Sequence, residues 1–262
     1  MDTLKIAAAV IRPIKGDPKG NAEKIKGFLK QAKEEGAKLV LFPECSLTSY
    51  AAEKAEELAL PKDDPCIKDI ETAADKLDIS VCFGYVEKTP GAMYICQEYY
   101  CDHKKTLYRK THLGSKEQLC VKEGDLCPVA EDGSISIGMQ LCWESHIPQI
   151  SSFYRKKGVQ LLLFPYASGM SGEKCRENWN VHLPARASDN GCFAAACNLL
   201  SGEKGGGIAF WDPKGRTISE YFGNDEKMLV CEIGGTLPRE LFEKGEETMH
   251  SLSYFDRARD IF

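Results

Sequence analysis

The chain lacks several features that would place it in specific classes of protein. Its 262 residues contain no apolar run that approaches the roughly 18 residues of a membrane-spanning helix. Its net charge of -5 provides no basic field for a nucleic-acid backbone or an anionic lipid surface. The N-terminal stretch MDTLKIAAAVIRP leads directly into a strand-like run, without a signal-peptide cleavage pattern. We therefore expect a soluble, cytoplasmic protein that acts on a small molecule, with no nucleic acid and no membrane as partner.

The twelve cysteines include no CxxC pair, the spacing typical of zinc and iron–sulfur sites. Several of them, including Cys82, Cys197 and Cys231, lie inside apolar runs, where a free thiol behaves as a small hydrophobic side chain. We therefore expect no metal site and predict that most of the cysteines are reduced core residues.

Strand-like runs alternate with helical patterns from one end of the chain to the other. SVCFGYVE, VQLLLFP and MLVCEI are typical of strands, whereas residues 65–77, 147–157 and 174–189 are typical of helices. We find no internal repeat and no long linker, so residues 1–262 are expected to form a single domain. The pattern predicts an α/β fold, with either two sheets packed face to face between helices or one doubly wound sheet.

Three chemically competent residues each follow an apolar run: Glu44 after LVLFP, Lys110 after TLYR and Cys142 after IGMQL. Functional side chains of open α/β sheets collect at such strand ends. A carboxylate among apolar neighbours can act as a general base, a fixed ammonium can stabilise an oxyanion, and a thiolate is a nucleophile. Each residue alone also fits an ordinary role, as a surface charge or a structural thiol. Their occurrence together is what favours a site.

Cys142 is the strongest single candidate. It precedes WESHIPQ, in which Pro-Gln opens a helix, so its sulfur is expected on a strand-to-helix turn. Such a turn exposes the nucleophile and directs helix N–H groups toward it, which we expect to lower the thiol pKa and to supply an oxyanion donor. A Cys–His dyad with His112, His146 or His182 is an alternative, but no third, orienting residue is evident.

Six short motifs occur in order along the chain. They are FPE at 42–44, RKTHL at 109–113, CWE at 142–144, RASDN at 186–190, ACN at 196–198 and GGGIAFWDPKGR at 205–216. The ordered set resembles the motifs of the nitrilase, or carbon–nitrogen hydrolase, superfamily over nearly the whole length of the chain. The resemblance implies that the α/β fold is a four-layer αββα sandwich.

The resemblance also implies a Glu–Lys–Cys triad, with Glu44 as general base, Lys110 as oxyanion stabiliser and Cys142 as nucleophile. A second glutamate after the lysine belongs to the same pattern, and Glu117 matches it, with the implied role of orienting Lys110 or the substrate amide. The backbone N–H of Trp143 is the expected second oxyanion donor. Neither a metal nor an organic cofactor is implied.

Four residues are expected to bind substrate, namely Trp143, Glu144, Tyr50 and Tyr166, although aromatic residues in such positions also commonly belong to the core. The Trp-Glu pair after the nucleophile resembles true nitrilases, whereas a chain of 262 residues resembles the compact amidases.

The expected activity is hydrolysis of a small linear amide or N-carbamoyl compound through a cysteine thioester, with release of ammonia or an amine. The alternatives are a nitrilase and a catalytically silent binding or scaffold protein of the same fold. The resemblance further suggests a homodimer or larger homo-oligomer. Residues 251–262, which mix aromatic and charged side chains, could form an arm that packs on another subunit or an ordinary docked tail.

Overall fold

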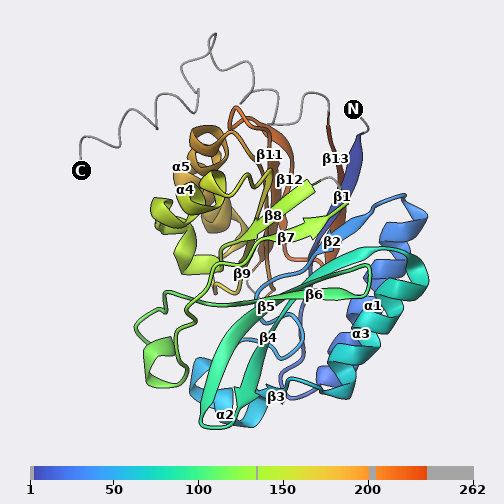
Figure 1. Ribbon diagram of the computed structural model, residues 1–262, viewed down its shortest axis with the longest axis vertical. Helices are drawn as coiled ribbons and strands as arrows, with labels where there is room; N and C mark the ends of the chain where they lie inside the picture. Colours follow the sequence, from blue (N-terminus) through green and yellow to red (C-terminus); the bar gives the residue numbers. More distant parts are fainter. Residues whose placement is uncertain (1–2, 134, 201–204, 235–262) are drawn as a thin grey trace.

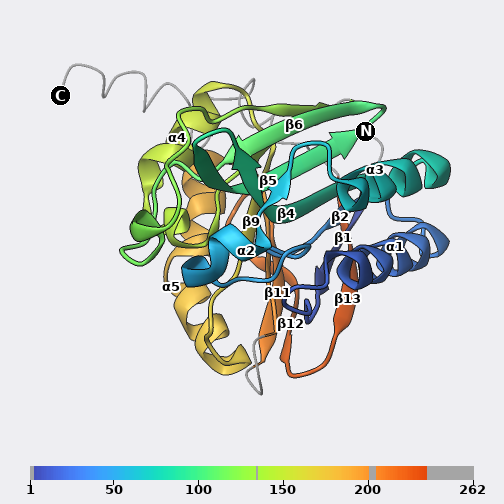
Figure 2. The ribbon, with the colours of Figure 1, turned by 90° about the horizontal axis from the view of Figure 1, so that it is seen from below.

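Two β-sheets pack face to face, and helices cover the outer face of each sheet (Figure 1). The computed structural model describes residues 3–133, 135–200 and 205–234. The helices α1 (Pro18–Glu34) and α3 (Pro65–Leu77) lie on one side and α4 (Pro148–Lys156) and α5 (Gly172–Asn190) on the other, as the view from below also shows (Figure 2). The four-layer αββα sandwich is therefore confirmed, and the doubly wound alternative is wrong.

The first sheet has seven strands. In spatial order they are β13 (Lys227–Ile233), β1 (Leu4–Val10), β2 (Leu39–Leu41), β4 (Ser80–Thr89), β5 (Ala92–Cys101) and β6 (Lys104–Arg109), with β3 (Leu60–Pro61) paired to β4. The helices α1 (Pro18–Glu34) and α3 (Pro65–Leu77) cover its outer face. The short α2 (Ala55–Leu58) follows a 3₁₀ turn, η1 (Ala52–Lys54).

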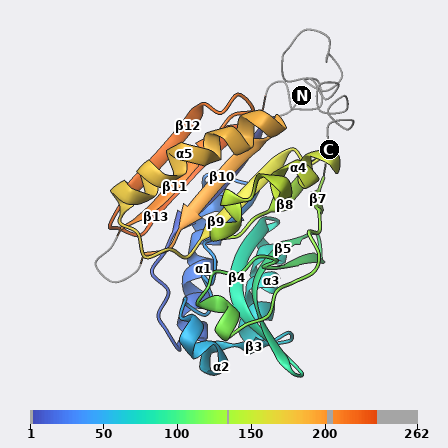
Figure 3. The same ribbon diagram turned by 90° about the vertical axis from the view of Figure 1, so that its left-hand side faces the viewer.

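The second sheet has six strands. In spatial order they are β12 (Thr217–Gly223), β11 (Gly206–Trp211), β10 (Phe193–Asn198), β9 (Leu161–Tyr166), β8 (Ile135–Met139) and β7 (Ala130–Asp132). Its outer face carries α4 (Pro148–Lys156) and α5 (Gly172–Asn190), which lie in front of the strands in Figure 3. Strands β8 and β9 flank α4 and pair in parallel, so this part of the chain forms a crossover connection. The strand β7 lacks an apolar run, since two of its three residues are acidic.

Strand β1 shows why the central strands are apolar on both faces. Ile6, Ala8 and Val10 pack between the two sheets, whereas Ala7 and Ala9 pack under the helices on the outer face. Alternate side chains of a strand point to opposite faces, so a strand buried on both sides reads as a continuous apolar run. The small alanines allow both layers to pack closely against this strand.

Local signals in the sequence define several element ends. The side chain of Asp17 accepts a hydrogen bond from the backbone N–H of Gly20 at 2.9 Å and so caps α1, which begins with a proline. The hairpin between β5 and β6 turns at Asp102 and His103, both of which have positive φ, as a two-residue type I′ turn requires. None of the helices in the described ranges combines the length and the apolar character needed to cross a bilayer.

The strand directions bring the predicted site together. Strands β2, β4 and β6 run the same way, so Glu44 and Lys110 follow carboxyl ends at one edge of the first sheet. In the second sheet, the parallel strands β8 and β9 end just before Cys142 and Ala167. The two edges meet at one end of the sandwich, and the cavity described below lies there.

Gly138 in β8 allows α4 to sit close to the second sheet. A Cβ atom at Gly138 would lie 2.6 Å from Cγ of the buried Tyr154 on α4. We predict that Gly138→Ala lowers the free energy of unfolding by about 1–3 kcal/mol, as overpacking of a core does. The matched control is Gly27→Ala on the exposed side of α1, where an added Cβ would contact no described atom beyond the adjacent residues and backbone of its own helix. This change should raise stability by about 0.8 kcal/mol. Urea denaturation measures both, and equal effects would contradict the packing argument.

Candidate active site

A cavity of about 580 Å³ opens where the two sheet edges meet. Glu44, Lys110, Glu117 and Cys142 all line it, together with Trp143 at its mouth. These residues come from four separate stretches of the chain. The fold thus places all four predicted catalytic side chains in a single chamber.

Lys110 lies between two carboxylates. Its Nζ donates to Oε1 of Glu44 and to Oε1 of Glu117, each at 2.9 Å. All three residues are buried, with exposed fractions of 4% or less. The hydroxyl of Tyr50 donates to the same Glu117 oxygen at 3.0 Å, and the backbone N–H of Gly114 donates to Oε2 at 2.7 Å. Glu117 is therefore fixed by three donors and in turn holds the ammonium.

The charge state of Lys110 follows from these partners. Burial alone lowers the pKa of an ammonium, but the neighbouring Glu44 carboxylate and other negative groups outweigh burial and raise the pKa of Lys110 well above its usual value. The side chain is a permanent cation at neutral pH. It can stabilise negative charge that develops in the cavity.

Glu44 is the titratable carboxyl of the cluster. Burial raises its pKa most, Lys110 opposes this rise, and Glu117 adds to it, so that the pKa of Glu44 is about 7. Only Oε1 of Glu44 meets Lys110, and within the described residues the buried Oε2 has no hydrogen-bond partner. An acceptor atom that faces no partner, on a group that titrates near neutrality, suits a general base.

Cys142 occupies the predicted strand-to-helix turn. Its φ of 47° is in the left-handed region, which a residue with a Cβ adopts rarely, and it begins the 3₁₀ helix η3 (Cys142–His146). Strained backbone of this kind occurs at nucleophile turns that present a side chain to a cavity. Cys142 is partly buried and lines the chamber beside Lys110.

The expectation of a lowered thiol pKa is wrong. Burial, followed by the charge of Glu44, raises the pKa of Cys142 to about 12, although Lys110 and the backbone of Ala167 act in the opposite direction. The α-helix that was expected to lower the thiol pKa begins only at Pro148, so the N–H groups of its first turn do not adjoin Cys142. The resting nucleophile is therefore a neutral thiol that needs a base.

The four predicted substrate-binding residues divide into two pairs. Trp143, which is 53% exposed, and Tyr50 line the cavity. Tyr166 does not line it: its ring packs on Trp179 in the core, with 4.9 Å between ring centroids. Glu144 does not line it either, because η3 turns its side chain into the interior, where it is completely buried. Of the four residues, only Trp143 and Tyr50 therefore line the cavity that holds Cys142.

The three histidines considered as dyad partners make other contacts: His112 and His182 form hydrogen bonds, and His146 stacks on His182. Nε2 of His182 lies 2.9 Å from Oγ of Ser145, its ring stacks on that of His146, and Nδ1 of His112 lies 2.9 Å from Oγ1 of Thr111. None of the hydrogen bonds found in the described part of the chain joins one of these rings to Cys142. Burial lowers the pKa of His182 to about 4, which makes it a poor base at neutral pH.

Residues 167–169 form one wall of the cavity and are not among the predicted site residues. A backbone hydrogen bond from Ala167 to Cys142 lowers the thiol pKa in part. The sequence contains a signal for this stretch, because it directly follows the buried strand β9 (Leu161–Tyr166), whose carboxyl end lies at the same sheet edge. These residues were not predicted, because their side chains have no distinctive chemistry.

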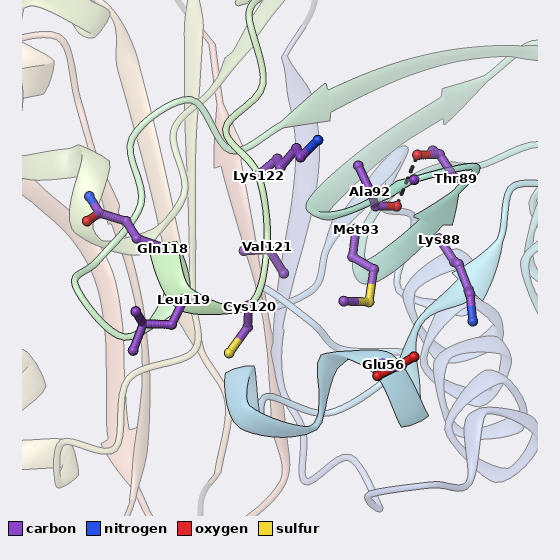
Figure 4. A pocket seen from close by; sticks show the side chains of 11 residues that line it. Glu56, Lys88, Thr89, Ala92, Met93, Gln118, Leu119, Cys120, Val121 and Lys122 are labelled. Atoms are coloured by element: carbon purple, nitrogen blue, oxygen red, sulfur yellow. Dashed lines mark hydrogen bonds between the residues drawn. The ribbon is translucent and has the colours of Figure 1, made fainter.

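A second cavity, of about 420 Å³, lies between the β4–β5 hairpin and the segment after Glu117 (Figure 4). Met93, Cys120 and Val121 line it, and Lys88 and Glu56 lie at the hairpin side. None of the four predicted catalytic residues lines this cavity. Across the described ranges, no group of three or more histidine, cysteine or acidic side chains is arranged to hold a metal ion.

Comparisons with known proteins agree with this geometry. The sequence model of a family described as carbon–nitrogen hydrolase matches residues 5–236. The omega-amidase NIT2 of Xenopus tropicalis is 25% identical over 247 residues, which cover 88% of this chain and 87% of that protein.

Two solved structures show the likeness of fold. An amidase from Nesterenkonia sp. has a TM-score of 0.79 at 24% identity and covers 88% of this chain and 90% of its own. XC1258 from Xanthomonas campestris, whose structure has an arsenic adduct in the active site, has a TM-score of 0.83 at 22% identity, with coverage of 93% and 95%.

Proposed function

Because the chain belongs to the carbon–nitrogen hydrolases, we propose that it is a thiol hydrolase that cleaves the C–N bond of a small linear amide or N-carbamoyl compound. The observation that carries the proposal is the meeting of Cys142 with the buried Glu44–Lys110–Glu117 cluster in one cavity. The products are a carboxylic or carbamic acid and ammonia or an amine.

The first half of the reaction forms a thioester. The sulfur of Cys142 attacks the amide carbon while its proton passes to the unpartnered oxygen of Glu44, whose pKa of about 7 suits this exchange. Negative charge on the former carbonyl oxygen is stabilised by the Lys110 ammonium and by the backbone N–H of Trp143. The leaving nitrogen takes the proton from Glu44, and the C–N bond breaks.

The second half restores the enzyme. Glu44 accepts a proton from water as the water oxygen attacks the thioester carbon, and the same oxyanion partners act again. The C–S bond then breaks, the proton returns to the sulfur, and the acid leaves. The sum is amide plus water giving acid plus ammonia or amine. Glu117 keeps the Lys110 ammonium aimed into the cavity throughout, through the bond at 2.9 Å.

The similarity to an omega-amidase favours amides over nitriles as substrates. The Trp-Glu pair, which resembles true nitrilases, is weak support for a nitrile substrate, because Glu144 lies outside the cavity. A nitrile would enter the same mechanism through addition of sulfur to the nitrile carbon, so a substrate panel separates the two.

We predict that the protein releases ammonia from members of a panel of short amides and carbamoyl amino acids, and not from the matching nitriles. Cys142→Ala should reduce turnover on the order of 1,000-fold or more, because it removes the nucleophile. The control is Cys66→Ala on α3, which should leave activity intact. Full activity in a folded Cys142→Ala variant would refute the mechanism. A wild-type protein that turns over nothing would favour the scaffold alternative, and turnover of nitriles alone would favour a nitrilase.

The pH dependence follows from Glu44. Its pKa is raised to about 7, and only the deprotonated form accepts the proton of the thiol. We therefore predict that kcat/KM rises with pH along a one-proton limb centred near 7 and levels off above it; a solvated glutamate would give a limb near pH 4.3. Glu98→Gln, which changes another buried carboxyl, should leave the limb in place. A kcat/KM that is flat from pH 5 to 8 would contradict this assignment.

We also propose that the protein forms a homodimer or a larger homo-oligomer. Residues 251–262, the suggested arm, lie outside the described residues. Support comes from apolar side chains on the outer helices, since Phe153 on α4 is 40% exposed and Val181 on α5 is 82% exposed. Sedimentation velocity of the wild type and of Val181→Glu tests this: the wild type should sediment as an oligomer and the variant should dissociate. A wild-type monomer would refute it.

A further inference from the structure

Glu144 is a completely buried carboxylate that the proposed mechanism does not use. Its Oε1 accepts four hydrogen bonds, from the hydroxyl of Tyr108 at 2.7 Å, the backbone N–H and the hydroxyl of Thr111 at 2.8 and 2.7 Å, and the backbone N–H of His112 at 3.0 Å. Its Oε2 accepts one, from the backbone N–H of Leu141 at 2.8 Å. Every one of these neighbours donates, and an ionised carboxylate only accepts.

These donors belong to two segments that are distant in sequence. Tyr108, Thr111 and His112 flank Lys110 on both sides, whereas Leu141 directly precedes Cys142. The two oxygens of one side chain therefore join the stretch that carries the ammonium to the stretch that carries the thiol. Glu144 itself lines neither the chamber nor the second cavity.

The carboxylate is held almost entirely by these hydrogen bonds. Among the described residues, the one ion-pair contact found for Glu144 is to Nδ1 of the half-exposed His112, 3.9 Å from Oε1, and that ring carries a charge only when it is protonated. A buried carboxylate is costly unless hydrogen bonds replace its hydration, and apolar packing would be a less costly way to fill the space. The backbone at Cys142 has a φ of 47° and persists only where its surroundings fix it. The hydrogen bond to Leu141 anchors the residue next to this strained position.

We propose that Glu144 is a positioning residue that sets the placement of the Lys110 ammonium relative to the Cys142 thiol by joining their two backbone segments. Its effect on turnover rests on the proposed function, whereas its effect on the thiol does not. Lys110 is the neighbouring charge that favours the thiolate of Cys142, so displacement of either segment weakens that effect.

The alternative is that Glu144 acts only through its negative charge, and the two roles predict opposite signs. Glu144 adds a small upward contribution to the pKa of Glu44. If charge alone mattered, Glu144→Gln would make the site less negative and Cys142 more reactive, and Glu144→Asp would change little. If position matters, both variants make Cys142 less reactive. Glutamine places an N–H₂ group against one of the donors, and aspartate is one methylene too short to reach both segments.

The experiment measures the alkylation rate of Cys142 by iodoacetamide, followed by peptide mass spectrometry. Cys66 on α3, which is partly exposed and remote from Glu144, is the reference within each sample. We expect Glu144→Gln and Glu144→Asp to slow alkylation of Cys142 by roughly 10-fold or more, with Cys66 unchanged. Faster alkylation in Glu144→Gln with an unchanged Glu144→Asp would overturn the proposal in favour of charge alone. Unchanged rates in both variants would overturn it as well.

A milder variant covers the case in which substitution of Glu144 prevents folding. Tyr108→Phe removes one donor on the Lys110 side and preserves the charge of Glu144 and the shape of the core. It should slow alkylation of Cys142 by about 3-fold or more without affecting Cys66, and an unchanged rate would overturn the proposal.

Turnover gives a second readout. In folded Glu144 variants, kcat should fall roughly 10- to 100-fold while KM changes less than about 3-fold, because the altered side chain does not reach the substrate. A rise in KM at constant kcat would overturn a positioning role in favour of a binding role. If the wild type hydrolyses no amide, the proposed function fails, but the alkylation rates still decide the role of Glu144.

Discussion

The arrangement of one cation between two buried carboxylates is the constraint on which the rest of the site depends. Lys110 neutralises only one of the two charges on Glu44 and Glu117, and the cluster lies where little water can screen it. The excess negative charge is least costly if one carboxyl retains a proton near neutral pH. Glu44, which has fewer donors than Glu117, is that carboxyl, and its raised pKa makes it a base of suitable strength.

The sandwich supplies the rigidity that such a cluster needs. Glu44, Lys110 and Cys142 each follow a strand of the sandwich, and these strand ends converge from both sheets. A neutral thiol, a base near its titration point and a permanent cation are then held together before any substrate arrives. Preorganised polar groups of this kind do not have to reorient as charge develops, and this is the main source of transition-state stabilisation in many enzymes.

The elements and the three central residues could be predicted because their signals are local. Apolar runs mark the strands, α3 begins and ends at the predicted residues, and Glu44, Lys110 and Cys142 stand at strand ends within recognisable motifs. The pKa of the thiol could not be predicted, because it depends on burial and on charges from other strands. The position of Glu144 could not be predicted either, since it depends on the rotation of a short 3₁₀ helix that packing determines. Whether an aromatic side chain such as that of Tyr50 lines the cavity or belongs to the core also depends on packing, so the sequence alone left both possibilities open.

The central claim is that the acyl group passes through a thioester on Cys142, and acid-quenched peptide mass spectrometry during turnover of an amide tests it most directly. The account predicts that the peptide containing Cys142 gains the mass of the acyl group, that added hydroxylamine removes this mass as a hydroxamate, and that no other cysteine peptide is labelled. An acyl group on a different residue would contradict the account. So would ammonia release at an undiminished rate after Cys142 has been fully alkylated.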